Sequence, residues 1–409
     1  MHVDPKAIDV KFLKSPEQAA LLAFHDVGGD SLYVPRDGQD PIGPVVSAES
    51  FITENFGSGQ RDTFFLCDPG TDDWMAGVLA LSDRDNFRID TIVPSFGNVP
   101  LRVTFNNARK LVALTGEFDV HVASGADRPL VGSMPEDASA EHGEDGLGGA
   151  SHKLADSLIF QNMSQVQSSQ GDGQERLKQT LIDRAESSGA PITILNTGSM
   201  TDLCVVLEQL AEENPKALSK IQGISLMGGG IDTGRWHTNI TDHAEFNFFQ
   251  DPIAAKRAFE LIEEHNIPTL VVPLEVTHTT GVRENHEGAW LKQQAVEKHN
   301  PVAAFTAEMY SAGGFDVERS HDFFKFPADK TTRFMHDPNV VTAIQKPKLY
   351  SGVYASIDIV TEGEEAGRML LKPKIDGPIF VALKADAPQV LMDWQSRIAN
   401  YRGAPANRL

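Results

Sequence analysis

The chain has 409 residues, of which 41% are hydrophobic and 23% are charged. This is the composition of a globular protein with enough residues for one large α/β domain or two ordinary ones. The formal net charge of −21 argues against a nucleic-acid or anionic-membrane partner, because either would need a basic face.

The first residues lack the basic segment and apolar core of a signal peptide, and no apolar run approaches the ~20 residues that span a bilayer. The chain has two cysteines, Cys67 and Cys204, which imply no disulfide framework. We therefore expect a cytoplasmic protein. Ser15 caps an expected helix through Phe24, and residues 28–44 are irregular. We interpret residues 1–60 as an extension packed on a main domain of residues 61–409.

From residue 62 the signals for strands and helices alternate along the chain. This order predicts an α/β fold with a mostly parallel sheet and helices on both faces. Expected strands cover 64–66, 89–93, 120–123, 192–195, 221–227, 269–273, 355–360 and 380–383. Expected helices cover 72–82, 101–115, 174–187, 251–265 and 387–399, and an apolar helix that ends near Leu210.

Two stretches depart from this alternation. Residues 151–188 are polar, and part of them is nearly of low complexity. Residues 313–335 are expected to form a long loop that carries Phe323, Phe324 and Phe326. Such a loop is either an active-site lid or a surface insertion, and the sequence leaves both open.

Three carboxylates lie within six residues of one another after the first strand of the alternation. The segment is Asp68-Pro69-Gly70-Thr71-Asp72-Asp73, and its Pro-Gly pair turns the chain between strand and helix. Ligands of open α/β sheets bind at the carboxyl ends of strands. Three anions so close together favour a hard cation such as Ca²⁺ or Mg²⁺. The alternative is that Asp72 and Asp73 are ordinary acidic residues of a helix's first turn.

Other polar residues follow other strands and are expected at the same edge of the sheet. Taken singly, each fits a structural role; Asp337, for example, suits a helix cap before Pro338. Together they supply acids, amides and imidazoles that suit a polyhydroxylated ligand held on a metal. These residues are Asn98, Thr197, Asn239, Glu245, Asn247, His336 and Asp337, with His142 in a further loop.

The segment Asp68–Asp73 resembles the N-terminal signature of the calcium-dependent nucleoside hydrolases, the inosine-uridine-preferring ribohydrolase family. Further blocks in family order extend the resemblance over about 62–385. They are 97–99, 123–130, 142–149, 196–203, 227–229, 244–247, 274–278 and 336–338.

The resemblance implies one Ca²⁺ ion, bound by the carboxylates of Asp68, Asp73 and Asp337 and by the backbone carbonyl of Thr197. It implies hydrolysis of the N-glycosidic bond of a ribonucleoside to free base and ribose, as in purine and pyrimidine salvage. A calcium-bound water would attack, with Asp68 as the general base.

The resemblance also implies roles for the residues around the sugar and the base. Asp72, Asn98 and Asn247 would hold the 2′- and 3′-hydroxyls, Asn239 and Glu245 would hold the 5′-hydroxyl, and Met227 belongs to the same substrate-binding set. His336, with His142 nearby, would supply a proton to the leaving base, and His336 predicts that inosine and uridine are both accepted. Trp74 and Trp236 could stack on a purine, although core packing is the alternative for each. Members of the family are often dimers or tetramers.

Two residues depart from the family pattern. Leu66 stands where the family has an aspartate, and Glu275 stands where an aspartate is commoner. The loss of a polar partner at Leu66 would lower metal affinity or activity. A second hypothesis is therefore a binding protein or effector of this fold that holds a nucleoside or an ADP-ribose-like ligand with little hydrolysis. An aspartyl phosphatase is disfavoured, because Gly70 stands where a second aspartate would be needed.

Overall fold

The computed structural model describes residues 44–153, 158–231, 238–310, 332–401 and 403. The expected helix from Ser15, the side chain of Trp236 and the three phenylalanines at 323, 324 and 326 lie outside these ranges. Within them, no helix is long and apolar enough to cross a membrane.

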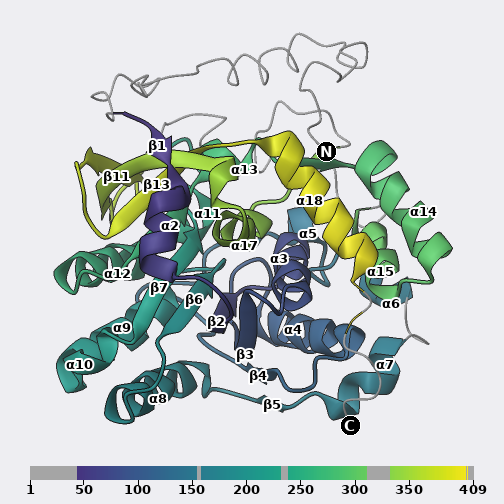
Figure 1. The fold of residues 1–409 in the computed structure, drawn as a ribbon, viewed down its shortest axis with the longest axis horizontal. Coiled ribbons are helices and arrows are strands. Elements are labelled where there is room, and N and C mark those ends of the chain that lie inside the picture. Colours follow the sequence, from purple (N-terminus) through teal and green to yellow (C-terminus); the bar gives the residue numbers. More distant parts are fainter. Residues whose placement is uncertain (1–43, 154–157, 232–237, 311–331, 402, 404–409) are drawn as a thin grey trace.

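The described chain is built on a central sheet of 11 strands (Figure 1). The order is β1-β11-β13-β8-β7-β6-β2-β3-β4-β5, and β12 pairs with β11 outside this path. From β13 to β5 every neighbouring pair is parallel, whereas β11 runs antiparallel to β13, β1 and β12. The strands are β1 (Val46–Ser47), β2 (Arg61–Cys67), β3 (Phe87–Pro94), β4 (His121–Ala123), β5 (Ser168–Ser169), β6 (Ile192–Asn196), β7 (Ile221–Met227), β8 (Thr269–Val272), β11 (Tyr350–Ile359), β12 (Met369–Pro373) and β13 (Ile379–Ala385).

Helices cover both faces of the sheet (Figure 1). One face carries α2 (Ala48–Phe56), α3 (Thr71–Ser82), α4 (Leu101–Thr115), α14 (Ala289–Lys298), α15 (Pro301–Met309), α17 (Pro338–Gln345) and α18 (Ala387–Asn400). The other carries α8 (Gly173–Glu186), α9 (Thr201–Glu213), α10 (Pro215–Leu218) and α12 (Pro252–Glu264). Shorter pieces are α5 (Ser139–His142), α6 (Ala150–Lys153), α7 (Leu158–Asn162), α11 (Phe246–Gln250), α13 (Leu274–Thr277), η3 (Met163–Gln165), η4 (Glu284–Gly288) and η6 (Pro347–Leu349).

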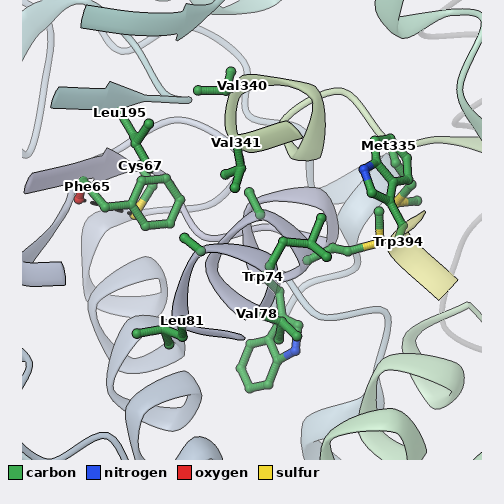
Figure 2. Packing of buried hydrophobic residues seen from close by; sticks show 14 of the residues in the cluster. Phe65, Cys67, Trp74, Val78, Leu81, Leu195, Met335, Val340, Val341 and Trp394 are labelled. Carbon is green, nitrogen blue, oxygen red and sulfur yellow. Dashed lines mark hydrogen bonds between the residues drawn. The ribbon is translucent and has the colours of Figure 1, made fainter. Parts of the chain in front are cut away.

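The position of β2 between β6 and β3 in the sheet explains why its sequence is apolar at successive positions. Side chains of a strand alternate between the faces of a sheet, and here both faces are covered. Phe65 and Cys67 therefore pack into the core beneath α3, whereas Phe64 and Leu66 pack into the core beneath α9. Figure 2 shows the first of these cores around α3. Trp74 is 1% exposed and its ring centroid lies 4.5 Å from that of Phe305, so this tryptophan has the core-packing role.

The expected α/β architecture is confirmed, and the helices and strands expected within the described ranges are present with small shifts of their ends. One difference lies in the expected loop of residues 313–335, whose end forms strand β10 (Thr332–Phe334). This strand pairs antiparallel with β9 (Gly281–Arg283) in a separate two-stranded sheet.

Candidate active site

The turn between β2 and α3 is held by the helix's own third residue, Asp73. Its Oδ2 accepts the backbone N–H of Gly70 at 3.0 Å, and its Oδ1 accepts that of Asp68 at 3.3 Å. Gly70 is needed because a Cβ there would lie 2.7 Å from Nδ1 of His142 and 2.8 Å from Nδ2 of Asn98. The turn thus brings carboxylates, an amide and an imidazole close together.

Asp68 is pressed against the end of the neighbouring strand β3. Its Oδ2 accepts the backbone N–H of Asn98 at 2.8 Å, and a Cβ on Gly97 would overlap this carboxylate. The side chain is only 1% exposed, and its Oδ1 has no hydrogen-bond partner. Burial, together with the negative charge of Asp73, raises the pKa of Asp68 well above its ordinary value.

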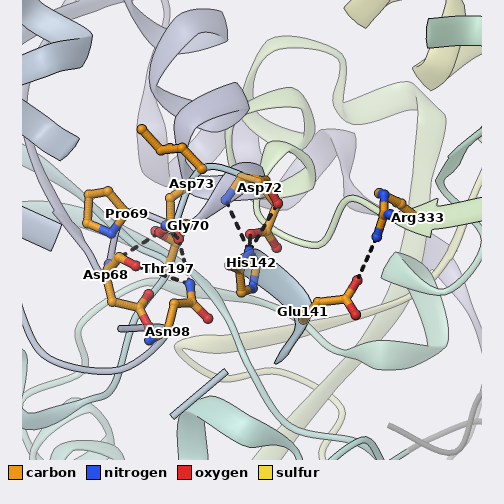
Figure 3. A network of polar contacts seen from close by, with 12 residues as sticks. Asp68, Pro69, Gly70, Asp72, Asp73, Asn98, Glu141, His142, Thr197 and Arg333 are labelled. Atoms are coloured by element: carbon orange, nitrogen blue, oxygen red, sulfur yellow. Dashed lines mark hydrogen bonds and ion pairs between the residues drawn. The ribbon is translucent and has the colours of Figure 1, made fainter. Parts of the chain in front are cut away.

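Three further carboxylates form a cluster beside it. Asp72, Asp73 and Asp337 each offer an oxygen within 4.8 Å of the others, and each is at most 4% exposed. Burial raises the pKa of Asp72 and of Asp73 to about 6, and that of Asp337 well above its ordinary value. Figure 3 shows Asp68, Asp72 and Asp73 in this network.

These four buried carboxylates fit a cation in their donor chemistry. Oδ1 of Asp68 and Oδ1 of Asp72 are both buried without a hydrogen-bond partner. Carboxylate oxygens are the ligands that Ca²⁺ and Mg²⁺ prefer. The three aspartates whose oxygens lie within 4.8 Å of one another are Asp72, Asp73 and Asp337. The resemblance led us to expect the carboxylates of Asp68, Asp73 and Asp337 as the metal ligands. The buried aspartates can therefore hold a metal ion.

Thr197, at the end of β6, hydrogen-bonds to the carboxylate cluster. Its hydroxyl donates to Oδ1 of Asp73 at 2.6 Å, and its backbone N–H donates to the carbonyl of Leu66 at 2.9 Å. Its own carbonyl accepts Nδ2 of Asn247 at 2.8 Å. A carbonyl oxygen has two lone pairs, so this bond leaves one for a further partner.

The residues expected to bind the sugar all line the same cavity. Nδ2 of Asn98 donates to Oδ2 of Asp73 at 2.9 Å. Glu245 caps helix α11, because its carboxylate accepts the N–H groups of Asn247, Phe248 and Gly229. Burial raises the pKa of Glu245 to about 7. The cavity is lined by Thr71, Asp72, Asn98, Glu141, His142, Thr197, Met227, Asn239, Glu245, Phe246, Asn247, Phe334, His336 and Asp337.

The two expected histidines lie in the same cavity wall. Nδ1 of His142 accepts the backbone N–H of Thr71 at 3.1 Å, which places the proton of the neutral ring on Nε2. Nδ1 of His336 lies 2.8 Å from the hydroxyl of Thr277. Burial lowers the pKa of both imidazoles, and the charges of His278 and His142 lower that of His336 further. Both shifts favour the neutral form of the ring.

The structure adds residues that the sequence did not single out. Glu141 and Phe334 line the cavity, and Nη1 of Arg333 lies 3.9 Å from Oε1 of Glu141 (Figure 3). They come from the short elements α5 and β10, which carry no periodic signal. Glu141 directly precedes His142, and Phe334 lies two residues before His336, so proximity to expected site residues was the one available signal.

Comparison with known proteins supports one family. The family model described as inosine-uridine preferring nucleoside hydrolase matches residues 64–393. A pyrimidine-specific ribonucleoside hydrolase, RihA, of Shewanella woodyi is 33% identical over 315 residues, covering 76% of this chain and 87% of the relative. The RihA of Escherichia coli is 31% identical over 303 residues, covering 73% and 84%.

Solved structures agree in fold. A purine-preferring ribonucleoside hydrolase from Gardnerella vaginalis has a TM-score of 0.65 at 22% identity, and an inosine-uridine preferring nucleoside hydrolase from Bacillus anthracis has 0.61 at 21%. Each alignment covers 83% of this chain and 99% of the other. The chain therefore belongs to the inosine-uridine preferring nucleoside hydrolase family of ribonucleoside hydrolases.

Proposed function

We propose that the protein hydrolyses the N-glycosidic bond of a ribonucleoside to free base and ribose. The observation that carries this proposal is the unpartnered Oδ1 of Asp68, buried beside three further carboxylates, of which Asp72 and Asp337 line a cavity together with amides and imidazoles. A carboxylate in such a place can accept a proton from a water molecule, and anions around the sugar favour the positive charge that develops as the bond breaks.

The ion that suits this donor set is Ca²⁺, held by Asp68, Asp73 and Asp337 with the carbonyl of Thr197. When bound, the ion supplies a positive charge that orients and acidifies a water molecule and orients the sugar hydroxyls. The residues contribute by their fixed positions. Asp73 is held by four donors, from Asp68, Gly70, Asn98 and Thr197, so its carboxylate needs little reorganisation on binding.

Asp68 is the proposed general base. Its Oδ2 is fixed by the N–H of Asn98, which leaves Oδ1 directed to a further partner. Removal of a general base costs about 10²- to 10⁴-fold in rate.

Ribose binding is assigned to residues that line the cavity. Asp72, Asn98 and Asn247 are proposed to hold the 2′- and 3′-hydroxyls, and Asn239 and Glu245 the 5′-hydroxyl; Met227 lies behind Asn247, its sulfur 3.3 Å from Nδ2. The leaving base takes a proton, and His336 is its proposed donor, with His142 beside it.

A pyrimidine ribonucleoside such as uridine is the proposed substrate class. Two relatives that are each more than 30% identical to this chain are named for pyrimidine-specific hydrolysis. No purine-stacking tryptophan is found among the described residues of the cavity wall, and Trp74 is in the core.

The test is release of free ribose from a panel of nucleosides in the presence of calcium, by the wild type and by Asp68→Asn. We expect release by the wild type and a loss of about 10²- to 10⁴-fold in kcat for Asp68→Asn. The matched control is Asp202→Asn, because Asp202 is a buried aspartate outside the cavity lining. If the wild type releases no ribose from any nucleoside but is thermally stabilised by one of them, the protein is a binding protein of this fold.

A further inference from the structure

We propose that Glu141 and Arg333 form a pair that recognises the lactam edge of the base, a ring N–H beside a ring carbonyl. The inference rests on the proposed function, since it assigns the base side of the same site. It makes Glu141 and Arg333 specificity-determining residues and leaves the bond-breaking chemistry to the groups already described.

The first step is the position of the base within the cavity. The carboxylates and amides proposed for ribose all belong to the lining. Other polar and aromatic side chains of the lining include Glu141 and His142 from α5, and Phe334 and His336 from β10 and the residues after it; Thr71, Thr197 and Phe246 also belong to the lining. For a nucleoside whose sugar lies on Asp72 and Asn247, we assign the base to the side chains of Glu141, His142, Phe334 and His336.

The second step is that α5 and β10 meet beside the cavity, where Glu141 and Phe334 belong to the lining and Arg333 directly precedes Phe334. Nη1 of Arg333 lies 3.9 Å from Oε1 of Glu141, and their side chains are 11% and 20% exposed. Glu141 and Arg333 also act in opposite directions on the pKa of His142, which Glu141 raises and Arg333 lowers. Glu141 in addition raises the pKa of Asp72. Nδ1 of His142, the residue after Glu141, lies 3.9 Å from Oδ1 of Asp72, so the pair lies close to the reacting groups and is largely shielded from solvent.

The third step is chemical complementarity. An ionised carboxylate only accepts hydrogen bonds and offers about four lone-pair positions, whereas a guanidinium only donates. Uracil presents N3–H between two carbonyls, and hypoxanthine presents N1–H beside O6. Glu141 suits the N–H and Arg333 suits the neighbouring oxygen. Hydrogen bonds to charged groups are the stronger kind, which makes such a pair selective.

Phe334 completes this part of the wall. Its ring lies 5.1 Å from that of His278 and 6.4 Å from that of His336, measured between centroids, so neighbouring rings hold it in place. An aromatic ring stacks on any base and carries no information about its edge. Discrimination between bases is therefore assigned to Glu141 and Arg333.

The experiment compares uridine with 3-methyluridine, which lacks the N3–H, and with 5-methyluridine, which carries the same extra methyl elsewhere on the ring. For the wild type with calcium we expect kcat/KM for 3-methyluridine to be about 10- to 100-fold below that for uridine, and 5-methyluridine to stay within a few-fold. In Glu141→Ala the gap between uridine and 3-methyluridine should fall to about threefold. In Glu141→Gln, which keeps an acceptor, the ratio of kcat/KM for uridine to that for 3-methyluridine should lie between the ratios of the wild type and Glu141→Ala.

The same three ligands are also titrated calorimetrically into Asp68→Asn, so that base recognition is measured without turnover. If the wild type hydrolyses nothing, the proposed function fails while these affinities still test the pair. The inference is overturned if Asp68→Asn binds uridine and 3-methyluridine with equal affinity in this titration. It is also overturned if Glu141→Ala weakens all three ligands equally, because the residue would then act only on the neighbouring charges.

Discussion

The hydroxyl of Thr197 donates a 2.6 Å hydrogen bond to Oδ1 of Asp73, which ties the end of β6 to the first turn of α3. The other oxygen of the same carboxylate accepts from Gly70 and from Asn98. Burial raises the pKa of Asp73 to about 6, and the bond from Thr197 opposes that rise. One side chain thus holds the central carboxylate in position and favours its ionised form.

The first prediction concerns this hydroxyl. Thr197→Val keeps the shape and the backbone carbonyl but removes the donor to Asp73. We expect calcium affinity, measured by isothermal titration calorimetry, to fall about 10- to 100-fold, the usual effect of losing a group that orients a ligand. Thr197→Ser is the matched control because it keeps the hydroxyl, and it should bind calcium nearly as the wild type does. Equal affinities for the valine variant and the wild type would contradict the assigned role.

A second prediction follows from the repulsion within the carboxylate cluster. The charges of Asp72, Asp73 and Asp68, after burial itself, raise the pKa of Asp337. In the presence of a chelator at pH 8, Asp337→Asn should therefore be more stable to urea than the wild type, by about 1–2 kcal/mol. Calcium should reverse this order, because mass action stabilises the wild type by about 4 kcal/mol at a thousand times its Kd.

The control for this comparison is Asp127→Asn, which removes a charge from an aspartate whose side chain is 60% exposed. It should change the urea midpoint little in either condition. If Asp337→Asn is less stable than the wild type both with and without calcium, Asp337 has a purely structural role.

The sequence was most informative where a signal is local. The apolar run of β2, the Pro-Gly turn and the carboxylates after it predicted both the sheet edge and the acidic cluster. Asp337 is far from Asp73 in sequence, and its place came from the resemblance alone. Glu141 and Phe334 could not be predicted, because a four-residue helix and a three-residue strand have no periodicity. Asn300-Pro301 did carry a usable signal for α15, since Asn300 caps that helix.

Leu66 gives a third prediction, since the departure from the family pattern has a physical explanation here. Its side chain is 2% exposed in the core beneath α9, and its carbonyl still accepts the N–H of Thr197. Restoring the family's residue by Leu66→Asp would bury a charge among apolar side chains. We expect a loss of about 3 kcal/mol or more in unfolding free energy and no gain in kcat.

Leu66→Met is the control, because it conserves volume and should cost less than about 1.5 kcal/mol. A Leu66→Asp variant with wild-type stability and higher activity would show that this position needs the polar partner that we expected from the resemblance.

Asp202 gives a fourth prediction, on pH dependence. Burial raises the pKa of this carboxyl to about 6 from an ordinary value of 3.8. The folded state then binds the proton more tightly than the unfolded state, so stability falls as pH rises from about 4 to about 6. Asp202→Asn keeps an oxygen for the N–H of Ala126 and for Gln174. It should match the wild type near pH 4 and exceed it at pH 7.5 by about 1–3 kcal/mol in urea unfolding. A difference that does not change with pH would contradict the assignment.

The last prediction concerns the space at Gly70. A Cβ there would lie 2.7 Å from Nδ1 of His142 and 2.8 Å from Nδ2 of Asn98. Gly70→Ala should therefore displace the imidazole from its bond with Thr71 and the amide from its bond with Asp73. We expect ribose release to fall at least 10-fold, because small misplacements in a reacting site are costly. Gly288→Ala is the control, since its Cβ would meet Tyr310 at an ordinary 3.5 Å. Wild-type activity in Gly70→Ala would show that the positions of His142 and Asn98 do not limit the reaction.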